Sequence, residues 1–296
     1  QSESAFCKLM DGGMQVSLST VTSGAAIRVS PLLQENNIFA LTPSASNPLV
    51  TLLEDGSAYG NVFQVCFTDP NQGSASADYI SQNSLGETVA VIYQNDIDYS
   101  NSIYATFKSQ ADAIGLHIVY EGTFIASDTD FTVQLTAAKE AGADVVFLPI
   151  YYSPATFILN QAIAMDYAPI FFGVDGMDGI LAQEGFDPAI AEGVYLLTPF
   201  SATKDDANVQ SFVSKYQAQF GTTPNQFGAD AYDAIYAIYQ ACQAAGVTSQ
   251  MSASDTCNAV VPQFTTMTFD GITGTSTWAA DGTVTKVPMA VVISDG

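Results

Sequence analysis

Small hydroxyl residues gather on two turns near the start of the chain. Ser23 stands where a predicted helix, residues 25–34, begins, and the strand predicted at residues 38–41 leads into Ser44 and Ser46. A helix N-terminus carries unpaired N–H groups and a partial positive charge, so hydroxyls beside it can hold an anion. Two such turns could bind a small carboxylate through neutral donors. Two helix N-caps and a surface loop would give the same pattern.

Aromatic and acidic residues follow three other predicted strands. Tyr99 comes shortly after the run TVAVIY, Tyr151 follows DVVFLPI, and Asp175 follows IFFGV. Ligands bind at the carboxyl edge of open α/β sheets, so these side chains and the serines are expected to line one crevice. An aromatic wall, one carboxylate and several hydroxyls suit a ligand with an ammonium, a carboxylate and an apolar side chain. Each residue alone also fits a structural role: helix surface, half-buried packing or a tight turn.

The sequence lacks the residue clusters for metal, phosphate or nucleophilic chemistry. The four cysteines, Cys7, Cys66, Cys242 and Cys257, form no CxxC pair, and His117 is the only histidine. Zinc has no ligand cluster, a serine nucleophile has no base, and the glycine-rich phosphate motifs are absent. We therefore expect no metal, no cofactor and no enzymatic activity. Cys242 and Cys257 lie on adjacent predicted helices and are compatible with either a disulfide or two free thiols.

The chain is strongly acidic, with seven Lys and Arg against thirty Asp and Glu and a net charge of −23. Nucleic acid is therefore not expected as a partner, because phosphate binding needs basic patches. No apolar run approaches the roughly 20 residues that span a bilayer, and no signal peptide is present. An amphipathic helix pattern opens the chain, with Ala5, Phe6, Leu9 and Met10 on one face. Because this resembles the interior of a helix rather than a natural start, we expect an N-terminal piece, including any export signal, to be missing.

Strands and helices alternate along most of the chain, which predicts an α/β fold. Continuous apolar runs are typical of parallel strands covered on both faces by helices. The length of 296 residues is large for one domain and suits two α/β lobes. The predicted strands are residues 14–19, 38–41, 61–67, 88–93, 117–120, 144–149, 170–173, 194–198, 266–269, 276–278 and 290–293. The predicted helices are residues 25–34, 73–82, 100–114, 131–141, 155–165, 206–220, 225–245 and 254–264, with a short one at residues 179–184.

Several longer stretches together resemble one protein family. The chain is similar to the type 1 periplasmic, or solute-binding, proteins, in particular the leucine/isoleucine/valine-binding branch of the ABC importers. The matching stretches run in the family's order over nearly the whole chain: VTSGAA, ALTPSASNP, FQVCFTDPNQG, VAVIYQNDIDYS, TDFTVQLTAAKEAGADVVFLPIYY, FFGVDGMDG, AEGVYLLTPF, PNQFGADAYDAIYA and FDGITGTSTWAADGTV.

The resemblance implies two Rossmann-like lobes with parallel sheets flanked by helices, joined by three crossovers. Lobe 1 would consist of residues 1–69 and 200–287, and lobe 2 of residues 70–199 and 288–296. The chain departs from the family at its start, because the family's opening strand and helix are absent. That segment supplies core strand pairing and an aromatic residue near the ligand side chain.

The resemblance also implies roles for the hydroxyl residues on the first lobe. The hydroxyls of Ser23 and Ser46 match residues that bind the ligand carboxylate. The backbone carbonyl of Ser44 matches one that helps to hold the ammonium.

On the second lobe the resemblance implies an aromatic and acidic group. Tyr99 matches an aromatic residue at the cleft, and Tyr151 matches one that contacts the amino group. Asp175 matches an acidic residue that pairs with the ammonium and is usually glutamate in the best-known members. Because aspartate is one methylene shorter, the ammonium would have to sit closer or a water would have to bridge.

The function that the resemblance implies is capture of an amino acid, branched-chain or aliphatic, and its delivery to the permease of an ABC importer. We expect a monomer in an extracytoplasmic location, either periplasmic or as a cell-surface lipoprotein. The alternative is a ligand-sensing domain of a receptor or regulator with the same fold. A hydrolase that uses an exposed serine is a third hypothesis, which the lone His117 leaves without a base.

Overall fold

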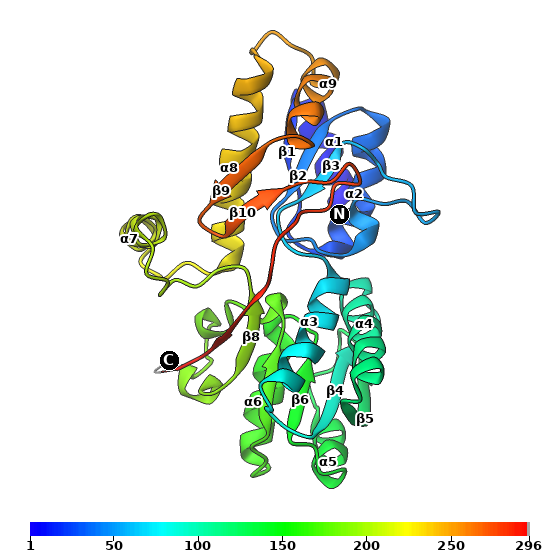
Figure 1. The fold of residues 1–296 in the computed structure, drawn as a ribbon, viewed down its shortest axis with the longest axis vertical. Coiled ribbons are helices and arrows are strands. Elements are labelled where there is room, and N and C mark those ends of the chain that lie inside the picture. The colour runs from blue at the N-terminus through cyan, green and yellow to red at the C-terminus, as the bar shows by residue number, and fades with distance from the viewer. Residues whose placement is uncertain (295–296) are drawn as a thin grey trace. The chain divides into compact units, whose positions relative to one another are not determined.

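The computed structural model describes residues 1–294, which divide into two compact units (Figure 1). Unit 1 consists of Gln1–Thr68 and Ala202–Val287. Unit 2 consists of Asp69–Ser201 together with the chain from Pro288 on. The chain therefore passes between the units three times, after Thr68, Ser201 and Val287.

Unit 1 is built on a parallel sheet in the order β1-β2-β3, with an antiparallel hairpin of β9 and β10 farther along the chain. In the register, Val16 lies opposite Phe39 and Ala40 opposite Val62. Its strands are β1 (Val16–Leu18), β2 (Phe39–Thr42), β3 (Val62–Gln64), β9 (Thr268–Gly271) and β10 (Gly274–Thr277). Its helices are α1 (Ser2–Asp11), α2 (Ser23–Glu35), α7 (Ala207–Phe220), α8 (Gln226–Ala245) and α9 (Ala253–Phe264).

The central strand β2 is buried on both faces, as its apolar sequence FALT predicts. Successive side chains of a strand point to opposite faces. Phe39 and Leu41 accordingly join a cluster with residues of α8 and α9, whereas Ala40 joins one with α2. On the first face the ring of Phe39 packs on Phe264 of α9, with centroids 4.7 Å apart. Burial of each large side chain of this kind stabilises the fold by about 2 kcal/mol.

The first helix packs less completely than its pattern predicts. Phe6 is buried against α2 and Met10 is half-buried, but Ala5 and Leu9 of the same predicted face are exposed. A helix needs a partner surface along its whole stripe to bury it. In unit 1, the described chain offers α1 a partner around Phe6 and Met10.

Unit 2 is built on a six-stranded sheet in the order β11-β8-β7-β6-β4-β5. Its strands run parallel except for β11, which pairs antiparallel with β8. The strands are β4 (Thr88–Gln94), β5 (His117–Phe124), β6 (Val145–Leu148), β7 (Ile170–Gly173), β8 (Tyr195–Thr198) and β11 (Met289–Val292). The helices are α3 (Asp69–Gln82), α4 (Asp98–Ile114), α5 (Thr132–Glu140) and α6 (Tyr152–Ala164).

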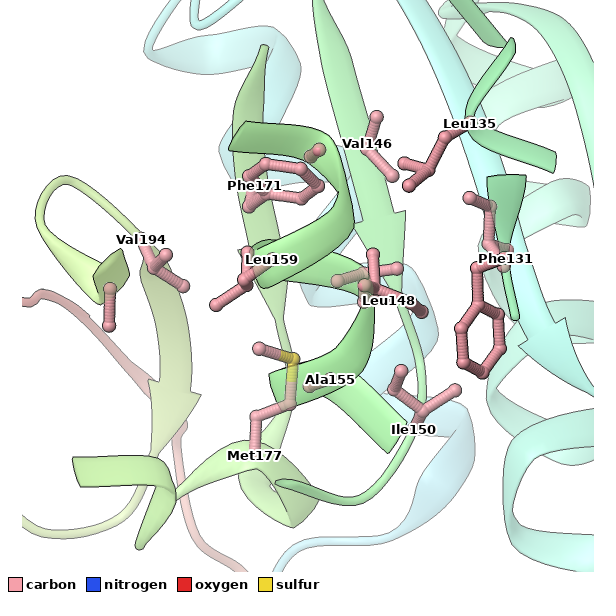
Figure 2. Close-up of a cluster of buried hydrophobic side chains, with 14 of the residues drawn as sticks. Phe131, Leu135, Val146, Leu148, Ile150, Ala155, Leu159, Phe171, Met177 and Val194 are labelled. Atoms are coloured by element: carbon pink, nitrogen blue, oxygen red, sulfur yellow. The ribbon is translucent and has the colours of Figure 1, made fainter. Parts of the chain in front are cut away.

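Alternate residues of β6 build the two cores of unit 2. Val145 and Phe147 pack with residues of α3 and α4, whereas Val146 and Leu148 pack with residues of α5 and α6. The second core also holds Met177, from the segment that follows β7, among the side chains of β6 and α6 (Figure 2). The loop after β7 is thus anchored to the core two residues beyond Asp175.

Helix α3 begins earlier than the pattern predicts, at Asp69 instead of residue 73. The prediction left residues 68–72 between the strand at residues 61–67 and the helix. Proline is compatible with the first turn of a helix, where its missing N–H would have no intrahelical partner. The longer helix includes Gln72, which is fully buried and lies within hydrogen-bond distance of the Asp175 backbone.

Within residues 1–294, no helix combines the length and the apolar character needed to cross a bilayer.

Candidate functional site

In unit 1 the serines meet at the start of α2. Ser23 is the first residue of this helix, and its Oγ accepts hydrogen bonds from the backbone N–H groups of Ser46 and Asn47, each at 3.3 Å. Thr22 occupies the N-cap position without making a side-chain capping bond, and the first turn contains no acidic residue. The positive end of the helix dipole is therefore uncapped by its own side chains and suits an anion.

The loop after β2 is held by hydrogen bonds from both sides. The Oγ1 of Thr42 donates to the carbonyl of Thr20 at 2.7 Å and accepts from the N–H of Ala45 at 3.2 Å. The Nε2 of Gln64, at the end of β3, donates to the carbonyls of Ala45 and Asn47 at 2.8 and 3.2 Å. This loop is thus a preorganised platform, which the sequence pattern described only as polar. The role of Gln64 was not foreseen, because its partners lie on another strand and its spacing carries no motif.

Ser44 and Ser46 lie in this loop and are both buried. The Oγ of Ser46 and the Oγ1 of Thr20 have no hydrogen-bond partner among the described residues. A buried hydroxyl without a partner costs about 1–3 kcal/mol, so each is ready to bind a ligand oxygen or a water. Thr20 belongs to the same hydroxyl-rich turn as Ser23.

In unit 2, Tyr99 and Asp175 form a buried hydrogen-bonded pair. Asp175 follows β7 as the first residue of the 3-10 helix Asp175–Met177, and Tyr99 lies in the first turn of α4. The Oη of Tyr99 donates to Oδ1 of Asp175 at 2.5 Å and accepts the N–H of Gly176 at 2.9 Å. Asp175 is 1% exposed and Tyr99 is 2% exposed, so this network lies almost entirely out of water.

Tyr151 completes the aromatic wall of unit 2. It occupies the N-cap position of α6, and its ring stacks on that of Tyr99 with centroids 4.5 Å apart and an interplanar angle of 10°. Gly176 lies against both rings, because a Cβ built there would be 2.5 Å from the Tyr99 hydroxyl and 2.9 Å from the Tyr151 ring. Only glycine allows this close approach.

Burial raises the pKa of Tyr99 well above its ordinary value of 10.0, and the Asp175 carboxylate beside it raises it further. The phenol therefore stays protonated at physiological pH and keeps donating to Asp175. The donated hydrogen bond also fixes the orientation of the Asp175 carboxyl group.

The structure brings the predicted residues together in two groups. Ser23, Ser44 and Ser46 lie in one loop-and-helix region of unit 1. Tyr99, Tyr151 and Asp175 lie in contact with one another, directly or through Gly176, in unit 2.

The remaining reactive side chains do not join these groups. His117 begins β5 and is exposed, whereas Tyr99 and Asp175 follow the carboxyl ends of their strands. Cys242 and Cys257 are free thiols in the structure, and burial raises the pKa of Cys257 to about 11. Within residues 1–294, no three His, Cys, Asp or Glu side chains gather as metal ligands would.

Two α/β units with polar residues after the carboxyl ends of their strands define a class of ligand-binding proteins. Comparison with known sequences identifies the class more closely. The family of periplasmic binding proteins matches residues 1–295, and the chain belongs to this family. Its members are solute-binding components of transporters and not enzymes.

The chain spans only part of the length of the curated relatives that it matches. The Leu/Ile/Val-binding protein homolog 3 of Brucella melitensis is 26% identical over 253 residues, which cover 86% of this chain and 67% of the relative. Across several curated relatives the chain spans about two thirds of their length or less, down to 47%.

Two solved structures show the same fold with different ligands. The substrate-binding protein LivJ of Streptococcus pneumoniae, in complex with isoleucine, is 25% identical with a TM-score of 0.87 and covers 99% of this chain and 80% of its own. A solute-binding protein from R. palustris in complex with benzoate is 19% identical with a TM-score of 0.86, covering 100% and 79%. The fold alone therefore does not select the ligand.

Proposed function

We propose that this protein binds an aliphatic amino acid, with unit 1 holding the carboxylate and unit 2 the ammonium. The two units act as the two lobes of a binding protein in this proposal. Relatives named as leucine-, isoleucine- and valine-binding proteins and the isoleucine complex of LivJ support the ligand class.

The carboxylate fits unit 1 because its donors are neutral and already in place. The start of α2 presents N–H groups and the positive end of the helix dipole. The Oγ of Ser46 is a buried donor without a partner among the described residues, and Ser23 positions the N–H of Ser46. Binding of a carboxylate there would satisfy donors that the fold otherwise leaves unpaired.

The single observation that carries the ligand class is the buried Asp175 with its Tyr99 and Tyr151 wall. A carboxylate at 1% exposure attracts an ammonium strongly and repels a ligand whose only charge is a carboxylate. The face of the half-buried Tyr151 ring that is not stacked on Tyr99 also favours a cation. This arrangement supports an amino acid over an aromatic acid such as benzoate.

Isothermal titration calorimetry tests the ligand class directly. We expect saturable heat with isoleucine, leucine or valine, and none with benzoate or with 3-methylvaleric acid, which is isoleucine without its amino group. Binding of benzoate in the absence of amino-acid binding would contradict the proposal.

We further propose that the protein works outside the cytoplasm and delivers its amino acid to an ABC permease. The family and the names of its relatives support this role. Uptake of radiolabelled leucine by cells with and without the gene is the test, and we expect uptake to fall when the gene is deleted. Unchanged uptake despite tight binding in vitro would instead favour a ligand-sensing role.

A further inference from the structure

Gln72, near the start of α3, contacts the backbone of Asp175. The sequence pattern predicted this helix from residue 73 on and therefore left Gln72 outside it. It lies in the first turns of α3 and is fully buried. Its Oε1 accepts the backbone N–H of Asp175 at 3.2 Å, across 103 positions of the sequence. Because this N–H needs an acceptor, the bond also sets which way the carboxamide of Gln72 points.

The segment that carries Asp175 is therefore held at two successive backbone groups. Gln72 accepts the N–H of Asp175, and the Tyr99 hydroxyl accepts the N–H of Gly176. Tyr99 also donates to the Asp175 carboxylate, so α4 holds both the backbone and the side chain. Gln72 supplies the contact from α3, the helix that begins where the chain enters unit 2.

The carboxamide of Gln72 is only partly satisfied by its hydrogen bond to the loop. Its Nε2 is buried and has no hydrogen-bond partner among residues 1–294. A buried amide N–H₂ without a partner is unfavourable, and an apolar side chain of similar size would avoid this cost. The polar residue is therefore best explained by what its oxygen does for Asp175.

We propose that Gln72 is a positioning residue for the ammonium site, acting through Asp175. This inference rests on the proposed function in that the ligand's ammonium is taken to bind Asp175. Gln72 fixes the backbone at Asp175 so that its carboxylate keeps one direction, toward the Tyr99 hydroxyl and the ammonium. It is not itself required to touch the ligand.

The first experiment needs no ligand. Hydrogen–deuterium exchange, read by NMR at the Asp175 amide, is compared between the wild-type protein and Gln72→Met. Methionine has a similar length but offers no comparable acceptor, so exchange at Asp175 should be faster by about tenfold. Gln72→Glu keeps an acceptor oxygen in either protonation state and should restore the protection. Gln82→Met, on the exposed end of the same helix, is the matched control and should leave it unchanged.

The second experiment measures isoleucine affinity by calorimetry. Gln72→Met should weaken binding by about tenfold, and Gln72→Glu by much less. The loss should disappear when Gln72→Met is made in an Asp175→Asn background, because a residue that acts through the Asp175 carboxylate has nothing left to position. If Gln72→Met fails to fold, Gln72→Asn, whose amide is one methylene too short, takes its place.

The two experiments separate the inference from the proposed function. If Gln72→Met leaves both the Asp175 exchange rate and the isoleucine affinity unchanged, the positioning role is wrong. An equal loss of affinity in the wild-type and Asp175→Asn backgrounds would also overturn it, since that result describes general destabilisation. If the wild-type protein binds no amino acid, the proposed function fails, while the exchange rates still decide whether Gln72 orders the Asp175 segment.

Discussion

At the scale of single residues, the Tyr99 hydroxyl both donates and accepts a hydrogen bond. Tyr99 donates to Asp175 and accepts from Gly176, so its oxygen is fully engaged by protein groups. Its donor is not available to a ligand. The family resemblance implies that Tyr99 lies at the cleft, and in the structure its hydroxyl is hydrogen-bonded to Asp175. Its ring remains as a stacking surface together with Tyr151.

Asp175→Asn tests the charge at this site without changing its shape. The asparagine oxygen can still accept the Tyr99 hydroxyl, but the negative charge is lost. We expect isoleucine binding to weaken by about 3 kcal/mol or more, roughly a hundredfold in Kd, as for removal of one member of a buried ion pair. Calorimetry measures it, and Asp112→Asn, exposed on α4, is the control. Equal affinities would place the ammonium elsewhere.

The sequence left open whether Cys242 and Cys257 form a disulfide, and in the structure both are free thiols. Cys7 is exposed, Cys66 and Cys257 are buried, and burial raises the pKa of Cys257 to about 11. At pH 8 only about a thousandth of Cys257 is then thiolate, the reactive form. We expect Ellman's reagent to titrate Cys7 quickly in the folded protein and Cys66 and Cys257 only after denaturation, to a total of four thiols. A total of two would mean that a disulfide is present.

At the scale of elements, the start of α2 is the feature on which the proposed carboxylate binding depends. Ser23 bridges it to the loop after β2, and Gln64 holds that loop from β3. The order of strand, hydroxyl-rich turn and helix could be predicted from the sequence, because each part depends on residues that are neighbours in the chain. The hydrogen bonds from Gln64 to this loop could not be predicted, since nothing near Gln64 in the sequence indicates which loop its side chain reaches.

Gly24→Ala separates helix stability from ligand binding at this terminus. Apart from its chain neighbours and the nearby backbone of its own helix, no protein atom lies within 4 Å of a Cβ built at Gly24, the second residue of α2. Alanine should therefore stabilise the helix by about 0.5–1 kcal/mol. Its methyl group would nevertheless occupy space at the helix terminus where the carboxylate is proposed to approach. We expect a higher melting temperature together with weaker isoleucine binding; unchanged affinity would remove the start of α2 from the site.

Helix α3 shows how a boundary error conceals a functional residue. The prediction began the helix at residue 73, which left Gln72 in the segment between strand and helix. The structure continues the helix back to Asp69, so that Gln72 is carried into the core beside Asp175. Boundaries are weakly specified by local sequence, because proline is tolerated in a first helical turn.

At the scale of the whole molecule, charge is distributed unevenly over the two units. Unit 1 contains twelve Asp and Glu with five Lys and Arg, whereas unit 2 contains eighteen Asp and Glu with two Lys. Both units are therefore acidic, and neither attracts phosphate. The negative electrostatic field of both units favours a ligand that carries an ammonium group.

Small-angle X-ray scattering tests whether the two units act together. If isoleucine contacts both units, its binding favours a closed arrangement, because only that state makes both sets of contacts. We expect a particle mass near the 31.2 kDa of one chain and a smaller radius of gyration with saturating isoleucine. Asp175→Asn at the same isoleucine concentration should not contract. Saturation of the wild-type protein without contraction would show that binding occurs within one unit.

The sequence by itself determined the α/β alternation, the family and the positions of Ser23, Ser46, Tyr99, Tyr151 and Asp175 after predicted strands. The alternation and these positions depend on local periodicity and on residue types, which near neighbours in the chain largely specify. The family follows instead from the stretches that match its pattern over nearly the whole chain.

Only the tertiary structure decided what those residues touch. The bonds from Tyr99 to Asp175 and from Asp175 to Gln72 join residues 76 and 103 positions apart. These contacts form because α3 and α4 cover one face of the sheet of unit 2, the face on which Phe172 of β7 also packs. No local pattern encodes that packing, since it results from how whole helices bury their apolar faces.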